Sequence, residues 1–100
     1  MVRIYGRYCG PNWTAGKNRS AKDTPIEAFT KVKPIDALDD ACLLHDVECR
    51  RNNGCTKASD IRLATRANRV VRDPKSTKKQ KEAAKIVRNG ILLASKFRLK

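Results

Sequence analysis

Apolar residues recur at helical spacing after Pro34, and this pattern predicts a helix from about residue 35 to 51. Pro34 suits a helix start, and three aspartates in the first turns favour the positive end of the helix dipole. The sequence Asn52-Asn53-Gly54 tolerates left-handed backbone and predicts the helix end. The predicted apolar face consists of Ile35, Leu38, Cys42, Val47 and Cys49.

Two further helices are predicted in the second half of the chain. Thr56 or Ser59 can cap a helix that ends before Asp73 and Pro74, and another helix is expected from about Ser76. The first has an apolar stripe of Ile61, Ala64, Ala67 or Asn68, and Val71. The second has Ala83, Ile86 or Val87, Gly90 or Ile91, Ala94 and Phe97.

Residues 1–33 show no sustained period, because glycines and prolines interrupt them. We expect an ordered loop there, with one helical turn near Pro25 to Phe29 and no strand. The predicted fold is therefore all-α and a single domain. It consists of an N-terminal loop region (1–33), an antiparallel helix pair (34–73) and a basic C-terminal helix (74–100), and no run is long enough to cross a bilayer.

The four cysteines, Cys9, Cys42, Cys49 and Cys55, allow three different pairs of disulfides. An even number in so short a chain is typical of oxidising compartments. Zinc is the alternative, because Cys42, Cys49, Cys55 and His45 are close in the sequence. The first ten residues contain no apolar stretch of signal-peptide length, so export would require a signal that has already been removed.

The charge is unevenly distributed along the chain. The formal net charge of +13 lies entirely in residues 50–100, since residues 1–49 carry equal numbers of acidic and basic side chains. A basic surface of this kind attracts polyanions, of which nucleic acid and anionic lipid are the common ones. Arg62, Arg66 and Arg69 form one stripe at helical spacing.

The predicted helix pair has a register that brings chemistry together. If the two helices are antiparallel, Cys49 lies opposite Cys55 near the turn, and His45 lies opposite Asp60 about two turns away. A carboxylate beside an imidazole fixes its tautomer and leaves the other ring nitrogen free as a base. A purely structural ion pair is the alternative interpretation of this dyad.

The side chain of Asp46 points away from Asp60 and needs a partner of its own. A hard cation is one such partner, since the glycine-rich turn from Tyr8 to Asn12 can direct several carbonyl oxygens inward. A disulfide between Cys9 and Cys42 would hold this turn against the first helix.

Two stretches, YGRYCGPNW and DALDDACLLHDVEC, resemble the calcium loop and the active-site helix of the secreted phospholipase A2 superfamily. The loop is similar to that of plant-type members, and the short distance to Asp60 resembles the compact domains of parvovirus capsid proteins. The resemblance covers Tyr5 to Cys49 with a variable insert. It implies a small, disulfide-stapled phospholipase A2-like fold, secreted or virion-associated, that hydrolyses the sn-2 ester of phospholipids with Ca²⁺ as cofactor.

The resemblance also implies a role for individual residues. It makes His45 the general base, oriented by Asp60, and it pairs Cys9 with Cys42. The implied metal ligands are the Asp46 carboxylate and the carbonyls of Tyr8, Gly10 and Asn12, and the N–H of Gly10 is implied to stabilise the oxyanion.

The sequence departs from the family pattern at three positions. Asn12 replaces the second loop glycine, Ala41 replaces one of the paired cysteines before the histidine, and Cys49 stands where a supporting tyrosine is usual.

An interfacial enzyme also needs a membrane-binding surface. We expect Trp13, Ile26 and Phe29 to contact lipid, with the basic half attracting anionic headgroups. The alternative function is a nonenzymatic basic protein that binds nucleic acid or anionic membrane through residues 50–100.

Overall fold

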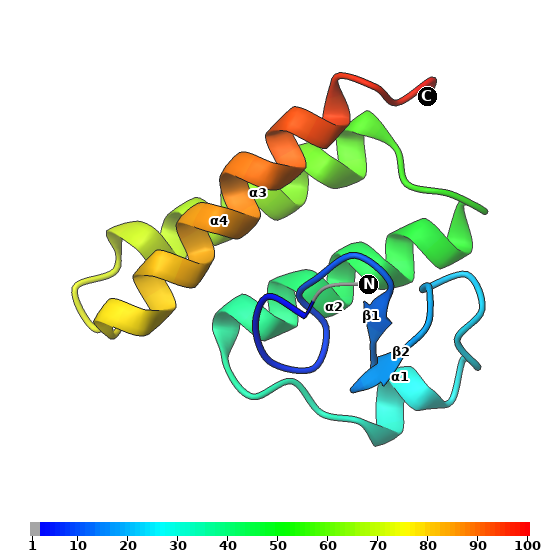
Figure 1. Ribbon diagram of the computed structural model, residues 1–100, viewed down its shortest axis with the longest axis horizontal. Helices are drawn as coiled ribbons and strands as arrows, with labels where there is room; N and C mark the ends of the chain where they lie inside the picture. The colour runs from blue at the N-terminus through cyan, green and yellow to red at the C-terminus, as the bar shows by residue number, and fades with distance from the viewer. Residues whose placement is uncertain (1–2) are drawn as a thin grey trace.

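Three long helices form the body of the protein, and the N-terminal third lies against the first of them (Figure 1). The structure is a computed structural model and describes residues 3–100. The long helices are α2 (Ala37–Arg51), α3 (Lys57–Arg72) and α4 (Lys78–Ser95). The three helices predicted from the apolar pattern are thus present. The ends of α2 and α3 lie within about two residues of the prediction, whereas α4 is shorter than the C-terminal helix expected over residues 74–100.

Each long helix begins at a side-chain cap. Asp36 accepts a hydrogen bond from the Asp39 N–H (2.9 Å) at the start of α2. Thr56 and Thr77 begin α3 and α4 with capping boxes. In each box the threonine side chain accepts a hydrogen bond from the backbone N–H three residues later, and the side chain of that later residue accepts one from the threonine N–H. The sequence left Thr56 and Ser59 open as the cap of α3, and the structure assigns the cap to Thr56 and the returning bond to Ser59.

The N-terminal third contains a small hairpin that the sequence did not predict. Strands β1 (Trp13–Thr14) and β2 (Lys17–Asn18) pair antiparallel through Ala15 and Gly16, which both have positive φ. Two residues per strand are too few to show an alternating pattern, so the expectation of an all-α chain without strands was wrong here. The single turn of α1 (Ala28–Lys31) follows, slightly later than expected.

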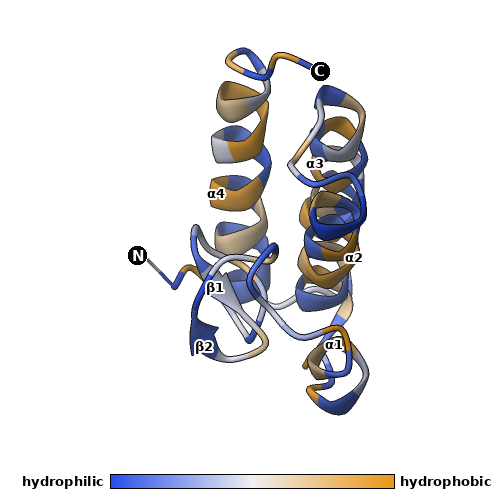
Figure 2. Cartoon of the chain, turned by 90° about the vertical axis from the view of Figure 1, so that its right-hand side faces the viewer, coloured by the Kyte–Doolittle hydropathy of each residue, from blue (hydrophilic) through white to orange (hydrophobic). Residues whose placement is uncertain are grey.

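The core forms where α3 packs between α2 and α4 (Figures 1 and 2). Small residues carry the α3–α4 contact, because Ala67 and Ala84 are fully buried and let the two helices approach closely. The predicted apolar faces are buried at Ala64 and Ala67 of α3 and at Ala83 and Val87 of α4, but they are wrong at one position in each predicted helix. Ile61 and Phe97 were expected inside and are 49% and 79% exposed, while Leu63 is buried instead.

Asp39 fastens the N-terminal loop to α2. Its fully buried carboxylate accepts the backbone N–H groups of Arg7 (3.0 and 3.1 Å), Tyr8 (2.9 Å) and Ile35 (3.0 Å). Gly6 lies so close that a Cβ atom there would overlap the carboxylate. From the sequence, Asp39 is expected only as a charge near the start of the helix, so its role in holding the loop is an addition from the structure.

Two disulfides complete the frame. Cys9 is bonded to Cys42 and joins the loop to α2, while Cys49 is bonded to Cys55 across the turn between α2 and α3. Because all four sulfurs are paired, no thiolate is left for a metal, and the zinc interpretation was wrong. Among residues 3–100, no helix is both long enough and apolar enough to cross a membrane.

Candidate active site

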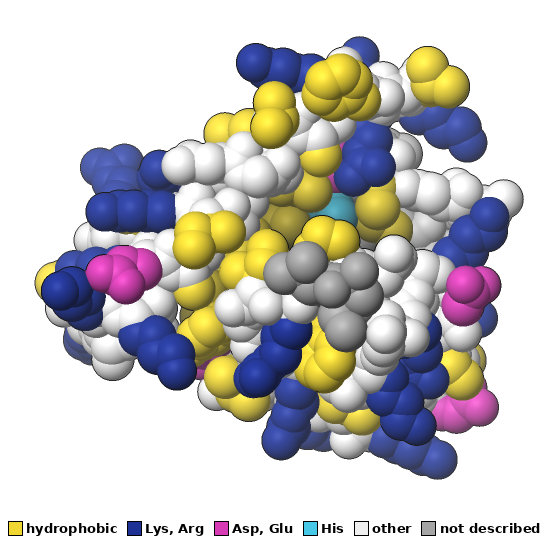
Figure 3. All heavy atoms as spheres, in the orientation of Figure 1, with side chains coloured by type: hydrophobic (Ala, Val, Ile, Leu, Met, Phe, Trp, Pro, Cys, Tyr) yellow, Lys and Arg dark blue, Asp and Glu magenta, His cyan; other side chains and the backbone are white. Residues whose placement is uncertain are grey.

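A cavity of about 470 Å³ opens between the N-terminal loop, the α2–α3 pair and α4. The only histidine of the chain, cyan in Figure 3, lies at the floor of a hollow bordered by apolar side chains. Loop residues, His45, Asp46 and Arg98 form the polar part of the wall. The apolar part of the wall is formed by Leu63, Ile86, Val87, Ile91 and Ala94 together with Ile4.

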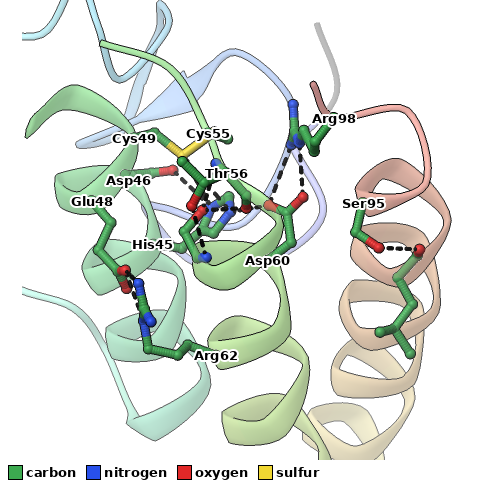
Figure 4. A network of polar contacts seen from close by, with 12 residues as sticks. His45, Asp46, Glu48, Cys49, Cys55, Thr56, Asp60, Arg62, Ser95 and Arg98 are labelled. Carbon is green, nitrogen blue, oxygen red and sulfur yellow. Dashed lines mark hydrogen bonds and ion pairs between the residues drawn. A yellow bond between two sulfur atoms is a disulfide. The ribbon is translucent and has the colours of Figure 1, made fainter. Parts of the chain in front are cut away.

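His45 and Asp60 meet across the α2–α3 pair (Figure 4). The Nε2 atom of His45 lies 2.7 Å from the Oδ1 atom of Asp60. The histidine is 7% exposed and the aspartate is fully buried. This contact is the one that the hairpin register predicted, because the Cys49–Cys55 bond aligns the two helices as expected.

Arg98 is a third member of this cluster, and the sequence analysis did not single it out. Its Nε donates to Oδ2 of Asp60 (2.7 Å), and its Nη2 lies 3.4 Å from Oδ1. Arg98 follows α4, 38 positions after Asp60, so no local pattern connects the two residues. As one of 23 basic residues, it carries no signal that sequence reasoning could have used.

Nδ1 of His45 is free of the dyad and faces Asp46. The Asp60 carboxylate accepts a hydrogen bond from the Nε2–H of His45, which leaves the lone pair on Nδ1. Nδ1 lies 3.9 Å from Oδ1 of Asp46, and the Cys49 sulfur packs against the ring at 3.7 Å from Nε2. Burial alone lowers the pKa of His45, but hydrogen bonding and charge from Asp46 and Asp60 raise it above its usual value.

Asp46 is a half-buried carboxylate without a full set of partners among residues 3–100. Its Oδ2 atom is enclosed and accepts no hydrogen bond from residues 3–100. Burial raises the pKa of Asp46 to about 6, although the adjacent His45 lowers it. An enclosed oxygen of this kind lacks the compensation that buried charges normally have, and a cation bound beside it would supply that compensation.

Residues of the N-terminal turn line the same cavity. Tyr8, Gly10 and Asn12 line it together with Asp46, as the resemblance implied. Within the described residues the carbonyls of Tyr8 and Asn12 accept no hydrogen bond, whereas the Gly10 carbonyl accepts one from Trp13 N–H (3.3 Å). Asn12 has a φ of 52°, so it adopts the left-handed backbone, which Asn tolerates better than most other non-glycine residues.

This donor set fits a calcium ion, because calcium prefers carboxylate and carbonyl oxygens. The side chain of Tyr8 anchors the turn in the core. Its ring is buried and stacks on Phe29, and its hydroxyl donates to the Val32 carbonyl (2.5 Å). Burial and the nearby carboxylates of Asp39 and Asp46 raise the pKa of Tyr8 to about 12, so its hydroxyl stays a donor.

The residues expected to contact lipid are not at the cavity. Phe29 is only 8% exposed and belongs to the core, so its assignment to the membrane surface was wrong. Trp13 is half-buried, and its Nε1 donates to the Gly6 carbonyl (3.1 Å). Ile26 is 59% exposed, but neither it nor Trp13 lines the cavity.

Comparison with protein families, curated proteins and solved structures finds no match to this chain. Its chemistry must therefore be argued from the site. Three features stand together there: a histidine oriented by a buried carboxylate, a second carboxylate with one oxygen that is unpartnered among residues 3–100, and a turn with two carbonyl groups that accept no hydrogen bond from these residues.

Proposed function

We propose that the protein is a calcium-dependent phospholipase A2 that releases the sn-2 fatty acid of phospholipids. The observation that carries the proposal is the arrangement in one cavity of His45, Asp46 and the Tyr8–Asn12 turn, with Asp60 behind the histidine. A structural ion pair would need only His45 and Asp60. Asp46 lines this cavity, and its enclosed Oδ2 has no hydrogen-bond partner among residues 3–100, which favours a site built for a ligand.

Asp46 and the carbonyls of Tyr8, Gly10 and Asn12 would hold the calcium ion. When bound, calcium supplies Lewis acidity that polarises the ester carbonyl, and it attracts the phosphate of the substrate. The Cys9–Cys42 bond and the Asp39 carboxylate keep the turn at α2 in the absence of the ion. The ligand set is thus largely preformed.

His45 would act as general base through Nδ1. A water molecule gives a proton to Nδ1 while its oxygen attacks the sn-2 carbonyl carbon, and the proton then passes to the departing lysophospholipid oxygen as the ester bond breaks. Asp60 stabilises the imidazolium that forms between these steps. The Gly10 N–H donates no hydrogen bond to residues 3–100 and lines the cavity, so it is free to stabilise the developing oxyanion.

The apolar wall of the cavity suits an acyl chain. Leu63 from α3 and Ile91 and Ala94 from α4 face the space next to the histidine. Burial of a hydrocarbon chain here is favourable by about 0.8 kcal/mol per methylene group. The predicted specificity is therefore for a long acyl ester over a short one.

The outer face of α4 and the tail after it supply the surface that we propose contacts the membrane. Ile86, Leu93, Phe97 and Leu99 are 57%, 58%, 79% and 102% exposed, and Ile86 also lines the cavity. The basic side chains of residues 50–100 would favour an anionic bilayer by about 1 kcal/mol for each well-placed Lys or Arg. This surface takes the place of the one expected around Phe29.

We place this activity outside the reducing cytosol, either secreted or virion-associated. The two disulfides support this, because such bonds persist in oxidising environments.

The test is fatty-acid release from phosphatidylglycerol vesicles in millimolar calcium and in chelator. We expect release by the wild-type protein only in calcium, and loss of release in His45→Gln and Asp46→Asn. Asp40→Asn is the matched control, since Asp40 is an exposed carboxylate on the same helix. Vesicle or nucleic-acid binding without hydrolysis under either condition would favour the nonenzymatic basic protein instead.

A further inference from the structure

The carboxylate of Asp60 is fully buried and has only two side-chain partners among residues 3–100, His45 and Arg98 (Figure 4). His45 takes Oδ1, while Arg98 donates its shorter bond to Oδ2 and lies 3.4 Å from Oδ1. The guanidinium thus occupies the edge of the carboxylate that the imidazole leaves open.

This arrangement fixes the direction of Oδ1. Without Arg98, Oδ2 would be a buried charged oxygen with no partner, which is costly. The carboxylate would then relieve the cost by rotating toward other donors or admitting water, and either change weakens the bond to His45 Nε2. A planar guanidinium restrains this rotation better than an ammonium group does.

The chain holds Arg98 in place through its backbone. The N–H of Arg98 donates to the Ser95 carbonyl (3.3 Å), and two residues later the Lys100 carbonyl accepts from the Lys57 N–H (2.9 Å). Lys57 is the first residue of α3, and its N–H has no partner inside the helix. The C-terminal segment is therefore fastened on both sides of the arginine and crosses to the helix that carries Asp60.

We propose that Arg98 is a positioning residue for the His45–Asp60 dyad. It restrains the Asp60 carboxylate so that Oδ1 holds His45 in the tautomer with the proton on Nε2, which leaves Nδ1 available at the cavity. For catalysis the inference rests on the proposed phospholipase activity, but the restraint on the imidazole is a property of the protein alone.

Three variants test the proposal. Arg98→Gln removes the charge and the planar set of guanidinium donors, Arg98→Lys keeps only the charge, and Lys96→Gln is the control. Lys96 is exposed and makes no side-chain hydrogen bond or ion pair within residues 3–100. Its replacement by glutamine removes the same charge two positions before Arg98. The first measurement is the tautomer of His45 from the imidazole ¹⁵N shifts in calcium-free protein, at a pH where the ring is neutral.

We expect the wild-type protein and Lys96→Gln to show the Nε2–H tautomer. Arg98→Gln should show a mixture of tautomers, and Arg98→Lys should lie between them. A pure Nε2–H tautomer in Arg98→Gln would overturn the proposal, and so would an equal change in Lys96→Gln, which would indicate a general effect of charge.

The second measurement is hydrolysis of a short-chain phospholipid below its critical micelle concentration, so that membrane binding plays no part. We expect kcat of Arg98→Gln to fall about 10- to 100-fold with little change in KM. Losses of this size are typical when the hydrogen-bond partner behind a metal-binding side chain is removed. Partial recovery in Arg98→Lys and an unchanged rate in Lys96→Gln are expected. An unchanged kcat in Arg98→Gln would overturn the proposal.

The two measurements separate the two claims. If the wild-type protein hydrolyses no ester, the proposed function fails, while the tautomer still decides whether Arg98 restrains the dyad. If Arg98→Gln does not fold, the wild-type protein provides the test, because the Arg98 Nε–H should exchange with solvent more slowly than that of exposed arginines. Equally fast exchange would contradict the restraint.

Discussion

Replacement of Asp46 with asparagine should change the stability of the protein in opposite directions with and without calcium. The pKa of Asp46 is raised from 3.8 to about 6 because its carboxylate is buried beside the cavity. The folded state therefore binds a proton at Asp46 more tightly than the unfolded state does. The resulting stabilisation is complete below the pKa of Asp46 in the unfolded state and is lost as the pH rises through its pKa in the folded state. At pH 7.5 the ionised carboxylate therefore lowers the free energy of unfolding of the calcium-free protein.

The magnitude follows from the size of the pKa shift. A tenfold change in proton affinity corresponds to about 1.4 kcal/mol. The rise of the Asp46 pKa from 3.8 to about 6 therefore limits the effect on the free energy of unfolding to about 3 kcal/mol. Asparagine keeps the shape and removes the charge, but its amide still needs hydrogen-bond partners. We expect Asp46→Asn to raise the free energy of unfolding by about 1 to 3 kcal/mol in chelator at pH 7.5.

Calcium should reverse the order of the two proteins. Wild-type protein should gain about 4.1 kcal/mol at a calcium concentration 1,000 times Kd, which exceeds the advantage of Asp46→Asn in chelator, whereas Asp46→Asn should gain almost nothing. Urea unfolding at pH 7.5, in chelator and in calcium, measures both effects. The control Asp40→Asn should lose about 0.3 to 1 kcal/mol in both conditions, because it removes a charge that favours the helix dipole.

Two results would refute this reasoning. An Asp46→Asn protein that is less stable than wild type in chelator would mean that the carboxylate is satisfied within the protein. An Asp46→Asn protein that keeps the full calcium effect would mean that the ion binds elsewhere.

Three other predictions follow from the loop and the dyad. Gly6→Ala should lower the free energy of unfolding by at least 2 kcal/mol, because it combines left-handed strain of about 1 to 2 kcal/mol with overlap on a buried carboxylate. Gly16→Ala, with similar φ but open space around it, should cost only the strain, and equal losses in urea unfolding would contradict the contact. Replacing Cys9 and Cys42 with alanine should cost about 3 to 4 kcal/mol in the chain-entropy model and weaken calcium binding by calorimetry, and unaltered calcium affinity would count against the strapped loop. Finally, kcat should fall as the pH is lowered through a value above 6.5, because the carboxylates raise the pKa of His45 and only the neutral ring acts as a base, so a profile that stays flat to pH 5 would speak against it.

The dyad could be predicted from the sequence because it depends on local geometry. A short turn ties α2 to α3, so the register of the pair follows once the turn is located between Asn52 and Cys55. Positions equally far from the turn then face each other, which places His45 near Asp60. Thr56 was one of the two cap candidates for α3 and is its cap, whereas Asp36 was expected only as a charge in the first turn and caps α2.

The features that sequence reasoning missed depend on contacts between distant segments. Asp39 was assigned to the helix dipole, yet its carboxylate organises a loop about 30 residues earlier in the chain. Phe29 sits in a segment without periodicity, where nothing distinguishes a core residue from a membrane-facing one. Arg98 reaches the dyad only because α4 packs along α3 and returns the chain to the start of that helix.

The central claim is that His45, Asp46 and the Tyr8–Asn12 turn form one calcium-dependent hydrolytic site. The most direct measurement uses phosphatidylglycerol vesicles with a labelled fatty acid at the sn-2 position. The account predicts release of the label in millimolar calcium, none after calcium is chelated, and recovery when calcium is restored. Release that is equal with and without calcium, or no release at all by protein that binds the vesicles, would contradict it.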